Sequence, residues 1–147
     1  MSRTFSEDAI VEQPVMDILS QDLAWEVANV YEGEVFGASG TIGRDSQADV
    51  LLKHRFLKAI ELLNPNLPEV AYTNAYELIN ANDITKNLSE LNHQKYEYLK
   101  DGIPVSYKDE DGELVLKQRL KVFDFDHPEK NDFLAVQQLW VEGKSKR

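Results

Sequence analysis

The sequence predicts an α+β fold in which a helical first half packs on an antiparallel hairpin or sheet. Two observations indicate this class. Up to about residue 102, apolar residues recur mainly at helical spacing, and beyond it they alternate with a period of two. Helices followed by strands are typical of α+β domains rather than of doubly wound ones. With 147 residues the chain has the length of one domain, so we expect residues 1–147 to form a single domain.

The first half is expected to hold four helices and one short strand. Ser6 suits the N-cap of the first helix, and Pro14 is expected to kink or split that helix because it removes a backbone donor. A strand at about 25–31 precedes the loop GASGTIGRDSQ, for which we expect a flexible surface position. Three further helices are expected at 48–63, 68–80 and about 88–100. The last of them should end at Gly102, where a left-handed backbone conformation stops the helix.

The second half is expected to be a hairpin followed by one more strand. The segments IPVSYK and ELVLKQRLKVFDFD flank the turn DEDG. Residues 133–141 alternate in character and are expected to form a strand next to this hairpin. If one face of that sheet is solvated, Leu134 and Val136 should alternate in burial with Ala135 and Gln137.

Composition excludes several classes of function. The net charge of −10 argues against a surface that binds nucleic acid by general charge neutralisation. It would suit a protein that mimics DNA, although a solvated acidic surface is the simpler interpretation. With no cysteine, the chain has no disulfide, no Cys-based zinc site and no iron–sulfur cluster. No apolar run approaches membrane-spanning length, and we interpret the protein as cytoplasmic with no membrane contact.

Several motif-like patterns are interpreted as structural rather than as sites, so motif chemistry alone reveals no active site. The glycine spacing differs from that of a dinucleotide loop, and the GKS segment lacks the earlier glycine of a P-loop. A hairpin turn explains the acidic DEDGE, and the carboxylates of DFDH are expected to be solvated. These patterns are the glycines 37, 40 and 43, residues 143–145, the turn Asp109–Glu113, the pair Asp124 and Asp126, and the separated His54, His93 and His127.

Four segments in order carry a resemblance to a known family. They are SEDAIVE, GRDSQADVLLKHRFLKAIELLNPNLPEVAYTNAYELI, NHQKYEYLKDGIPVSY and KVFDFDHPEKNDFLAVQQLWVEG. Together they resemble the N-terminal region of the restriction (R) subunit of type I restriction–modification enzymes, over nearly the whole chain. Asn92–Gly102 and the segment P-x-x-NDFLAVQQ are among the most specific parts.

The resemblance implies an incomplete restriction-endonuclease-like nuclease domain, of the PD-(D/E)xK class. In the family, the catalytic Asp, Glu and Lys follow the strand that matches NDFLAVQQLWVEG, and an ATP-driven motor lies further on. We therefore expect this chain to bind neither Mg²⁺ nor ATP, although the family uses both. The implied function is ATP-dependent double-strand cleavage of unmodified DNA, with modification and specificity subunits as partners. The alternative is a stand-alone interaction or anti-restriction module that mimics DNA without catalysis.

The resemblance also implies two candidate residues and an exposed edge. Related nucleases often place a glutamate of their first helix near the metal, and Glu12 and Glu7 lie on the matching helix here. An ordinary surface carboxylate or a partner of the helix dipole is the favoured interpretation of each. Since the strand that normally follows is absent, residues 133–141 should leave apolar surface exposed, and edge pairing could drive self-association.

Overall fold

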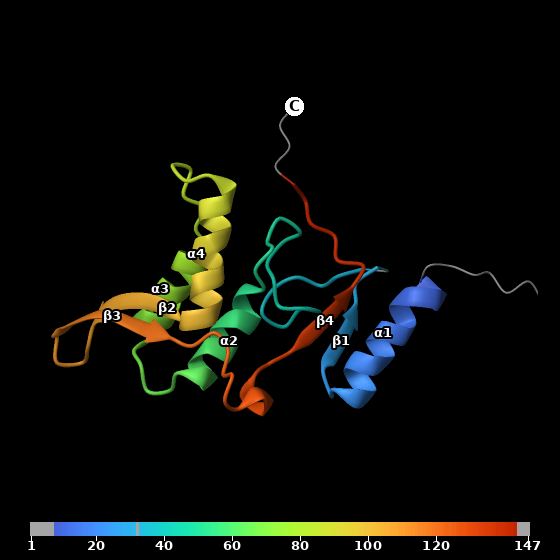
Figure 1. Ribbon diagram of the computed structural model, residues 1–147, viewed down its shortest axis with the longest axis horizontal. Helices are drawn as coiled ribbons and strands as arrows, with labels where there is room; N and C mark the ends of the chain where they lie inside the picture. The colour runs from blue at the N-terminus through green and yellow to red at the C-terminus, as the bar shows by residue number, and fades with distance from the viewer. Residues whose placement is uncertain (1–7, 32, 144–147) are drawn as a thin grey trace, which may run out of the picture. The chain divides into compact units, whose positions relative to one another are not determined.

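A computed structural model describes residues 8–31 and 33–143, with helices and strands mixed as the α+β class predicts (Figure 1). The chain divides into two compact units. Unit 1 combines residues 1–50 with 132–147, and unit 2 comprises residues 51–131. In the part of the chain that is described, no helix has the length and apolar character needed to cross a membrane.

Unit 1 begins with a helical segment that continues through Pro14. Pro14 lies in the first turn of an α-helix, where its missing N–H matters least, and π-helical turns flank that helix on both sides. The proline therefore coincides with a change in hydrogen-bond pattern and not with a break. Ser6 lies outside the described residues. The elements of unit 1 are η1 (Asp8–Glu12), α1 (Gln13–Asp17), η2 (Ile18–Asp22), β1 (Glu26–Asn29) and β4 (Leu134–Gln137).

The last strand is shorter than expected and has a different partner. β4 pairs in parallel with β1, and this corrects the expectation that residues 133–141 form a strand next to the hairpin. Just before the two strands, the rings of Trp25 and Phe133 stack with centroids 4.7 Å apart. This ring contact and the ladder with β1 hold β4 in place. Both join residues that are far apart in the sequence, so local sequence patterns do not indicate them.

The expected alternation in burial along β4 was also wrong. Leu134, Ala135 and Val136 are all half-buried, and Gln137 is buried. Strands of parallel sheets are commonly covered on both faces, which removes the contrast between them. The exposed apolar surface expected here is present just beyond the strand, where Trp140 is 62% exposed.

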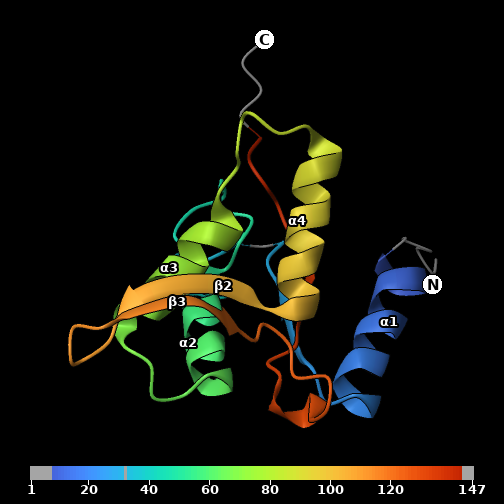
Figure 2. The same cartoon turned by 60° about the vertical axis from the view of Figure 1, so that its left-hand side comes forward.

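Unit 2 packs three helices against an antiparallel hairpin, as the sequence predicts. Figure 2 shows the hairpin lying across α2 and α3, with α4 close by. Its core takes side chains from every one of these elements, among them Ile60, Tyr72, Tyr98, Val105 and Leu120. The elements are α2 (Lys53–Leu63), α3 (Glu69–Asn80), α4 (Leu88–Asp101), β2 (Ile103–Lys108), β3 (Leu114–Leu120) and the short 3₁₀ helix η3 (Pro128–Lys130).

Helix α2 begins later than its apolar periodicity predicts. The expected range of 48–63 is wrong at its start, because the helix begins at Lys53 and Val50 is exposed. The carboxylate of Asp49 accepts hydrogen bonds from the backbone N–H and the hydroxyl of Ser46, at 2.9 and 3.1 Å. This local turn competes with helix formation over residues 46–49.

Helix α4 has well-defined ends. Asn87 and Glu90 form a capping box, in which each side chain accepts from the other's backbone N–H. Gly102 ends the helix with φ 91° and ψ 162°, a backbone region that only glycine adopts readily. A Cβ atom at this position would lie 2.8 Å from the carbonyl oxygen of Leu120. The predicted glycine stop is therefore confirmed. The close approach of β3 also requires a residue without a side chain at position 102.

Candidate functional site

The carboxyl ends of β1 and β4 lie side by side because the two strands are parallel. Asn29 and Gln137 are the last pair of the ladder, and Gln138 follows directly. In sheets with parallel strands, ligands commonly bind beyond the carboxyl ends of the strands. The polar side chains at this end of the sheet are therefore the first candidate site in unit 1.

Glu12 reaches this end of the sheet from η1. Its Oε2 accepts a hydrogen bond from Gln137 Nε2 at 2.7 Å. Gln138 Nε2 donates to both carboxylate oxygens, at 2.7 and 2.8 Å. Hydrogen bonds to an ionised acceptor are the stronger kind, so two amides hold this carboxylate in a defined position.

A second set of contacts fixes the amide of Gln137. Only 6% of this residue is exposed, and its Oε1 accepts from Gln13 Nε2 at 3.2 Å and from Asn29 Nδ2 at 3.3 Å. With its oxygen accepting twice, its nitrogen is directed at Glu12. We call Glu12, Gln13, Asn29, Gln137 and Gln138 the amide–carboxylate network.

Gln138 has an unusual backbone conformation. Its φ of 58° is left-handed, which is uncommon for a residue other than glycine. Such conformations cost about 1–3 kcal/mol and persist where the surrounding structure imposes them. Gln138 lies directly after β4, and its side chain makes the two hydrogen bonds to Glu12.

The network presents one carboxylate and does not form a complete cation site. Mg²⁺ requires close to six oxygen ligands in octahedral geometry. Within residues 8–31 and 33–143, no three or more His, Cys, Asp or Glu residues are grouped so that they could hold a metal ion. The described residues therefore do not fit a resident Mg²⁺ by themselves. Of the two glutamates singled out from the sequence, Glu12 joins the network and Glu7 lies outside the described residues.

A buried arginine forms the second polar centre of unit 1. Arg44 is fully buried, and Nε and Nη2 donate to the two carboxylate oxygens of Glu34 at 2.8 and 2.6 Å. It also donates to the carbonyl oxygens of Asp49 at 3.1 Å and Trp140 at 2.8 Å. The hydrogen bonds to Glu34 raise the pKa of Arg44 although burial acts to lower it. The arginine thus connects the loop, its flanking turn and the segment after β4.

This centre corrects the expectation of a flexible surface loop around the three glycines. Ile42, Gly43 and Arg44 are buried, and a Cβ atom at Gly40 would meet the carbonyl oxygen of Val35 at 2.1 Å. The backbone N–H of Gly37 donates to the carbonyl oxygen of Arg44 at 2.8 Å. Gly40 therefore allows close backbone packing within this loop.

The remaining patterns have structural roles. Asp109 Oδ1 accepts from the backbone N–H groups of Asp111 and Glu113, as expected for a hairpin turn. Asp124 is buried, contrary to the expectation that it is solvated, and accepts from the N–H groups of Asp126 and His127. The sequence did not single out either glutamine of the network or Arg44. Two adjacent amides that end an otherwise apolar strand are the signal that could have found the glutamines.

Comparison with known proteins gives the family of the chain. The family model described as the N terminus of type I restriction enzyme R proteins matches residues 4–147. The chain belongs to this family. The "Type I restriction enzyme HindI endonuclease subunit" of Haemophilus influenzae is 30% identical over 134 residues, which are 91% of this chain and 12% of that subunit. The putative MjaIXP endonuclease subunit of Methanocaldococcus jannaschii is 34% identical over 99 residues, 67% of this chain and 9% of that subunit.

The chain thus spans about a tenth of the length of these curated relatives of the R-protein family. No solved structure matches it at a significant level. The amide–carboxylate network and the Arg44 centre both lie within the matched residues, so they are features of a type I R-protein N-terminal region.

Proposed function

We propose that this chain forms the N-terminal part of the nuclease domain of a type I restriction R subunit. In the complete cytoplasmic enzyme, it would serve ATP-dependent double-strand cleavage of unmodified DNA together with modification and specificity subunits. The observation that supports this role most directly is the Glu12 carboxylate, held by Gln137 and Gln138 at the carboxyl ends of two parallel strands.

Glu12 is the residue of this chain to which we assign a part in the nuclease site. Its two amide donors orient the carboxylate, whose oxygens are ligands that a hard cation prefers. In metal-dependent nucleases, the metal polarises the phosphate and lowers the pKa of the attacking water. Because the described residues do not form a metal site, Glu12 is proposed as a supporting carboxylate and the principal ligands as residues from outside this chain.

A chimeric subunit tests this proposal. The 134 matched residues of the Haemophilus influenzae subunit are replaced by this chain, and cleavage and ATP hydrolysis are measured in the assembled enzyme. Glu12→Gln should lower cleavage roughly 10- to 100-fold and leave ATP hydrolysis intact, as for a residue that supports a metal site. Asp17→Asn is the matched control, because it removes an exposed carboxylate from the same helical segment.

The two readouts separate the possible failures. Equal loss of cleavage and ATP hydrolysis in Glu12→Gln would indicate damaged folding or assembly. Full cleavage by Glu12→Gln would remove Glu12 from the nuclease site and leave the subunit assignment in place. A parent chimera that assembles and hydrolyses ATP without cleaving DNA would contradict the proposed nuclease role.

A further inference from the structure

We propose that the exposed stem of the β2–β3 hairpin binds the phosphate backbone of duplex DNA through Lys117, Arg119 and Lys121. The proposed function is used here only to identify the polyanion as DNA. This surface belongs to unit 2 and includes no residue of the amide–carboxylate network.

Residues 114–121 form a basic stretch in an acidic chain. The net charge of the chain is −10, but residues 114–121 contain three bases and no acid. Residues 51–131 carry 11 of the 16 lysines and arginines and 14 of the 26 acids, a net charge of −3, whereas the rest of the chain carries −7. The overall acidity that argued against a nucleic-acid surface is therefore an average that does not apply to β3.

The three basic residues share a spacing that fits a phosphate backbone. Lys117, Arg119 and Lys121 are exposed and alternate along the chain with Gln118 and the buried Leu120. Alternate residues of a strand lie about 6.8 Å apart. Each phosphate of a DNA strand advances 3.4 Å along the helix axis and also turns around it, which puts neighbouring phosphates about 7 Å apart. The spacing of the basic side chains therefore corresponds to neighbouring phosphates.

A β-bulge lies at Lys117. The ladder is irregular between Val105 and Tyr107, and Lys117 has a left-handed φ of 51°. The bulge is held in place, because the N–H of Lys117 donates to Ser106 Oγ at 3.1 Å and Asn74 Nδ2 donates to the Ser106 carbonyl at 3.1 Å. Bulges commonly redirect a side chain at functional positions, and a strained residue that other elements stabilise points to such a use.

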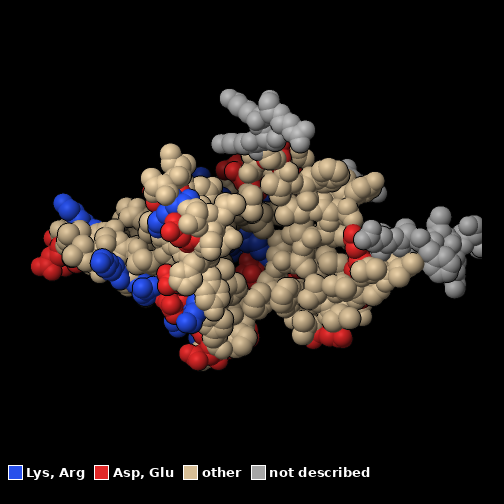
Figure 3. All heavy atoms as spheres, turned by 45° about the horizontal axis from the view of Figure 1, so that its top comes forward, with Lys and Arg blue, Asp and Glu red and all other residues tan. Residues whose placement is uncertain are grey.

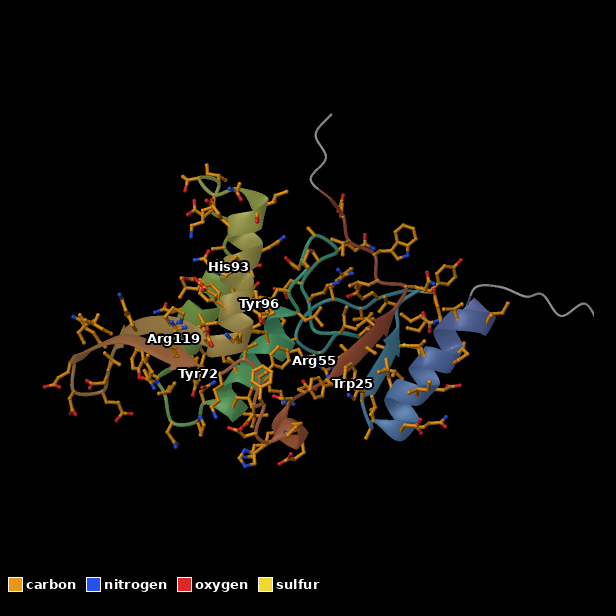
Figure 4. The ribbon with its side chains drawn as sticks, in the orientation of Figure 1. Trp25, Arg55, Tyr72, His93, Tyr96 and Arg119 are labelled. Atoms are coloured by element: carbon orange, nitrogen blue, oxygen red, sulfur yellow. The ribbon has the colours of Figure 1, made fainter. Side chains whose placement is uncertain are left out.

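Two of the three stem charges have no acidic partner among the described residues, and the third has a weak one. One Nη of Arg119, labelled on the hairpin in Figure 4, donates to the Gly102 carbonyl at 3.1 Å, which orients a guanidinium that has further donors. Lys121 Nζ is 3.9 Å from the Asp124 carboxylate and 58% of its side chain is exposed, so this pair is weak. Among the residues that the structure describes, the ammonium of Lys117 has no ion pair.

The tip of the hairpin limits the contact to the stem. Four acids occupy the turn, and Figure 3 shows carboxylates at this end of the surface beside basic side chains. Phosphates would be repelled by the tip and attracted to the stem. The acids at the tip are Asp109, Glu110, Asp111 and Glu113.

Binding of the whole chain to a fluorescein-labelled 20-base-pair duplex, measured by anisotropy between 25 and 150 mM salt, tests the proposal. The wild-type chain should bind in the range of non-specific affinities, roughly 10⁻⁴–10⁻⁶ M. Lys117→Glu/Arg119→Glu should weaken binding roughly tenfold and lower the salt slope by about two. Lys58→Glu/Lys130→Glu is the control, because it makes the same charge change at two exposed positions of unit 2. Glu110→Gln/Asp111→Asn should strengthen binding.

Thermal melting establishes that each variant is folded. The proposal is overturned if the wild-type chain does not bind, or if the stem variant and the control weaken binding equally. It is also overturned if Lys117→Glu/Arg119→Glu leaves DNA binding unchanged and alters only the molecular mass measured by light scattering. That result would show that the stem contacts a second copy of the chain. The stem substitutions are judged by DNA binding of the chain and Glu12→Gln by cleavage in the chimera, so failure of one proposal is distinguished from failure of the other.

Discussion

Gln138 donates from one side-chain nitrogen to both carboxylate oxygens of Glu12, across 126 positions of sequence. Its neighbour Gln137 donates to the same carboxylate from a buried position. One helical turn and the end of one strand thus depend on each other through a single charged group.

Removing the buried amide should destabilise unit 1. We expect Gln137→Ala to lower the free energy of unfolding by about 1–3 kcal/mol, because a buried amide is lost and Glu12 loses a donor. Gln47→Ala is the control at an exposed position and should change it by less than about 0.5 kcal/mol. Urea denaturation measures both. Equal effects of the two substitutions would show that the network adds no stability.

Arg44 should be among the most sensitive positions of the chain. Arg44→Ala leaves the Glu34 carboxylate buried and unpaired, so we expect a loss of about 3–5 kcal/mol in the free energy of unfolding. Arg44→Lys keeps the charge but not the two-pronged geometry and should cost less. In limited trypsin digestion, wild-type Arg44 should resist cleavage, whereas rapid cutting there would contradict its burial.

Gly102 and Gly112 provide a matched pair of glycine substitutions. Both have positive φ, at 91° and 80°, but a Cβ atom would meet the backbone of Leu120 only at Gly102. We expect Gly112→Ala to lower the free energy of unfolding by about 1 kcal/mol and Gly102→Ala by about 2–3 kcal/mol. If both substitutions lower the free energy of unfolding equally, β3 must move away from the new Cβ atom at position 102 without an energetic cost.

Asp124 should make stability depend on pH in the acid range. Burial raises the pKa of Asp124, but hydrogen bonds from the N–H of His127 and Asp126 and the charges of Lys121 and His127 outweigh it and hold the pKa below its usual value. A lowered folded pKa contributes stability above the unfolded value of about 4, and this is lost as the pH falls through the folded pKa. Asp124→Asn should therefore melt at a lower temperature at pH 6, and the difference should shrink at pH 2–3.

The chain alone should not cleave DNA. Supercoiled plasmid incubated with the chain and Mg²⁺ should stay intact, because Glu12 offers one carboxylate and, among the described residues, no three or more His, Cys, Asp or Glu residues are grouped so that they could hold a metal ion. Agarose gels measure nicking. Nicking that Glu12→Ala abolishes would contradict this prediction and show that the chain holds a complete active site that includes Glu12.

Local signals in the sequence were sufficient for most of unit 2. The glycine stop at Gly102 and the change to a period of two identified α4 and the hairpin, since each signal acts within a few residues. Unit 1 depends on distant partners. Alternation in FLAVQQ indicates a strand, but it does not indicate whether that strand pairs with β1 or with the hairpin. Arg44 can be buried because Glu34 and three backbone carbonyl groups accept hydrogen bonds from it. Glu12 was a candidate by resemblance, whereas its amide partners came from the structure.

The pairing of β1 with β4 has a consequence for synthesis on the ribosome. Asn29 and Gln137, the last pair of the ladder, are 108 residues apart, and all of unit 2 lies between them. At about 5–20 residues per second, β1 is translated roughly 5–20 s before its partner. The residues of unit 2 are contiguous and can fold in that interval, whereas β1 keeps an unpaired edge until β4 emerges. The first strand to be made is therefore among the last to be completed, and its unpaired edge is open to mispairing until then.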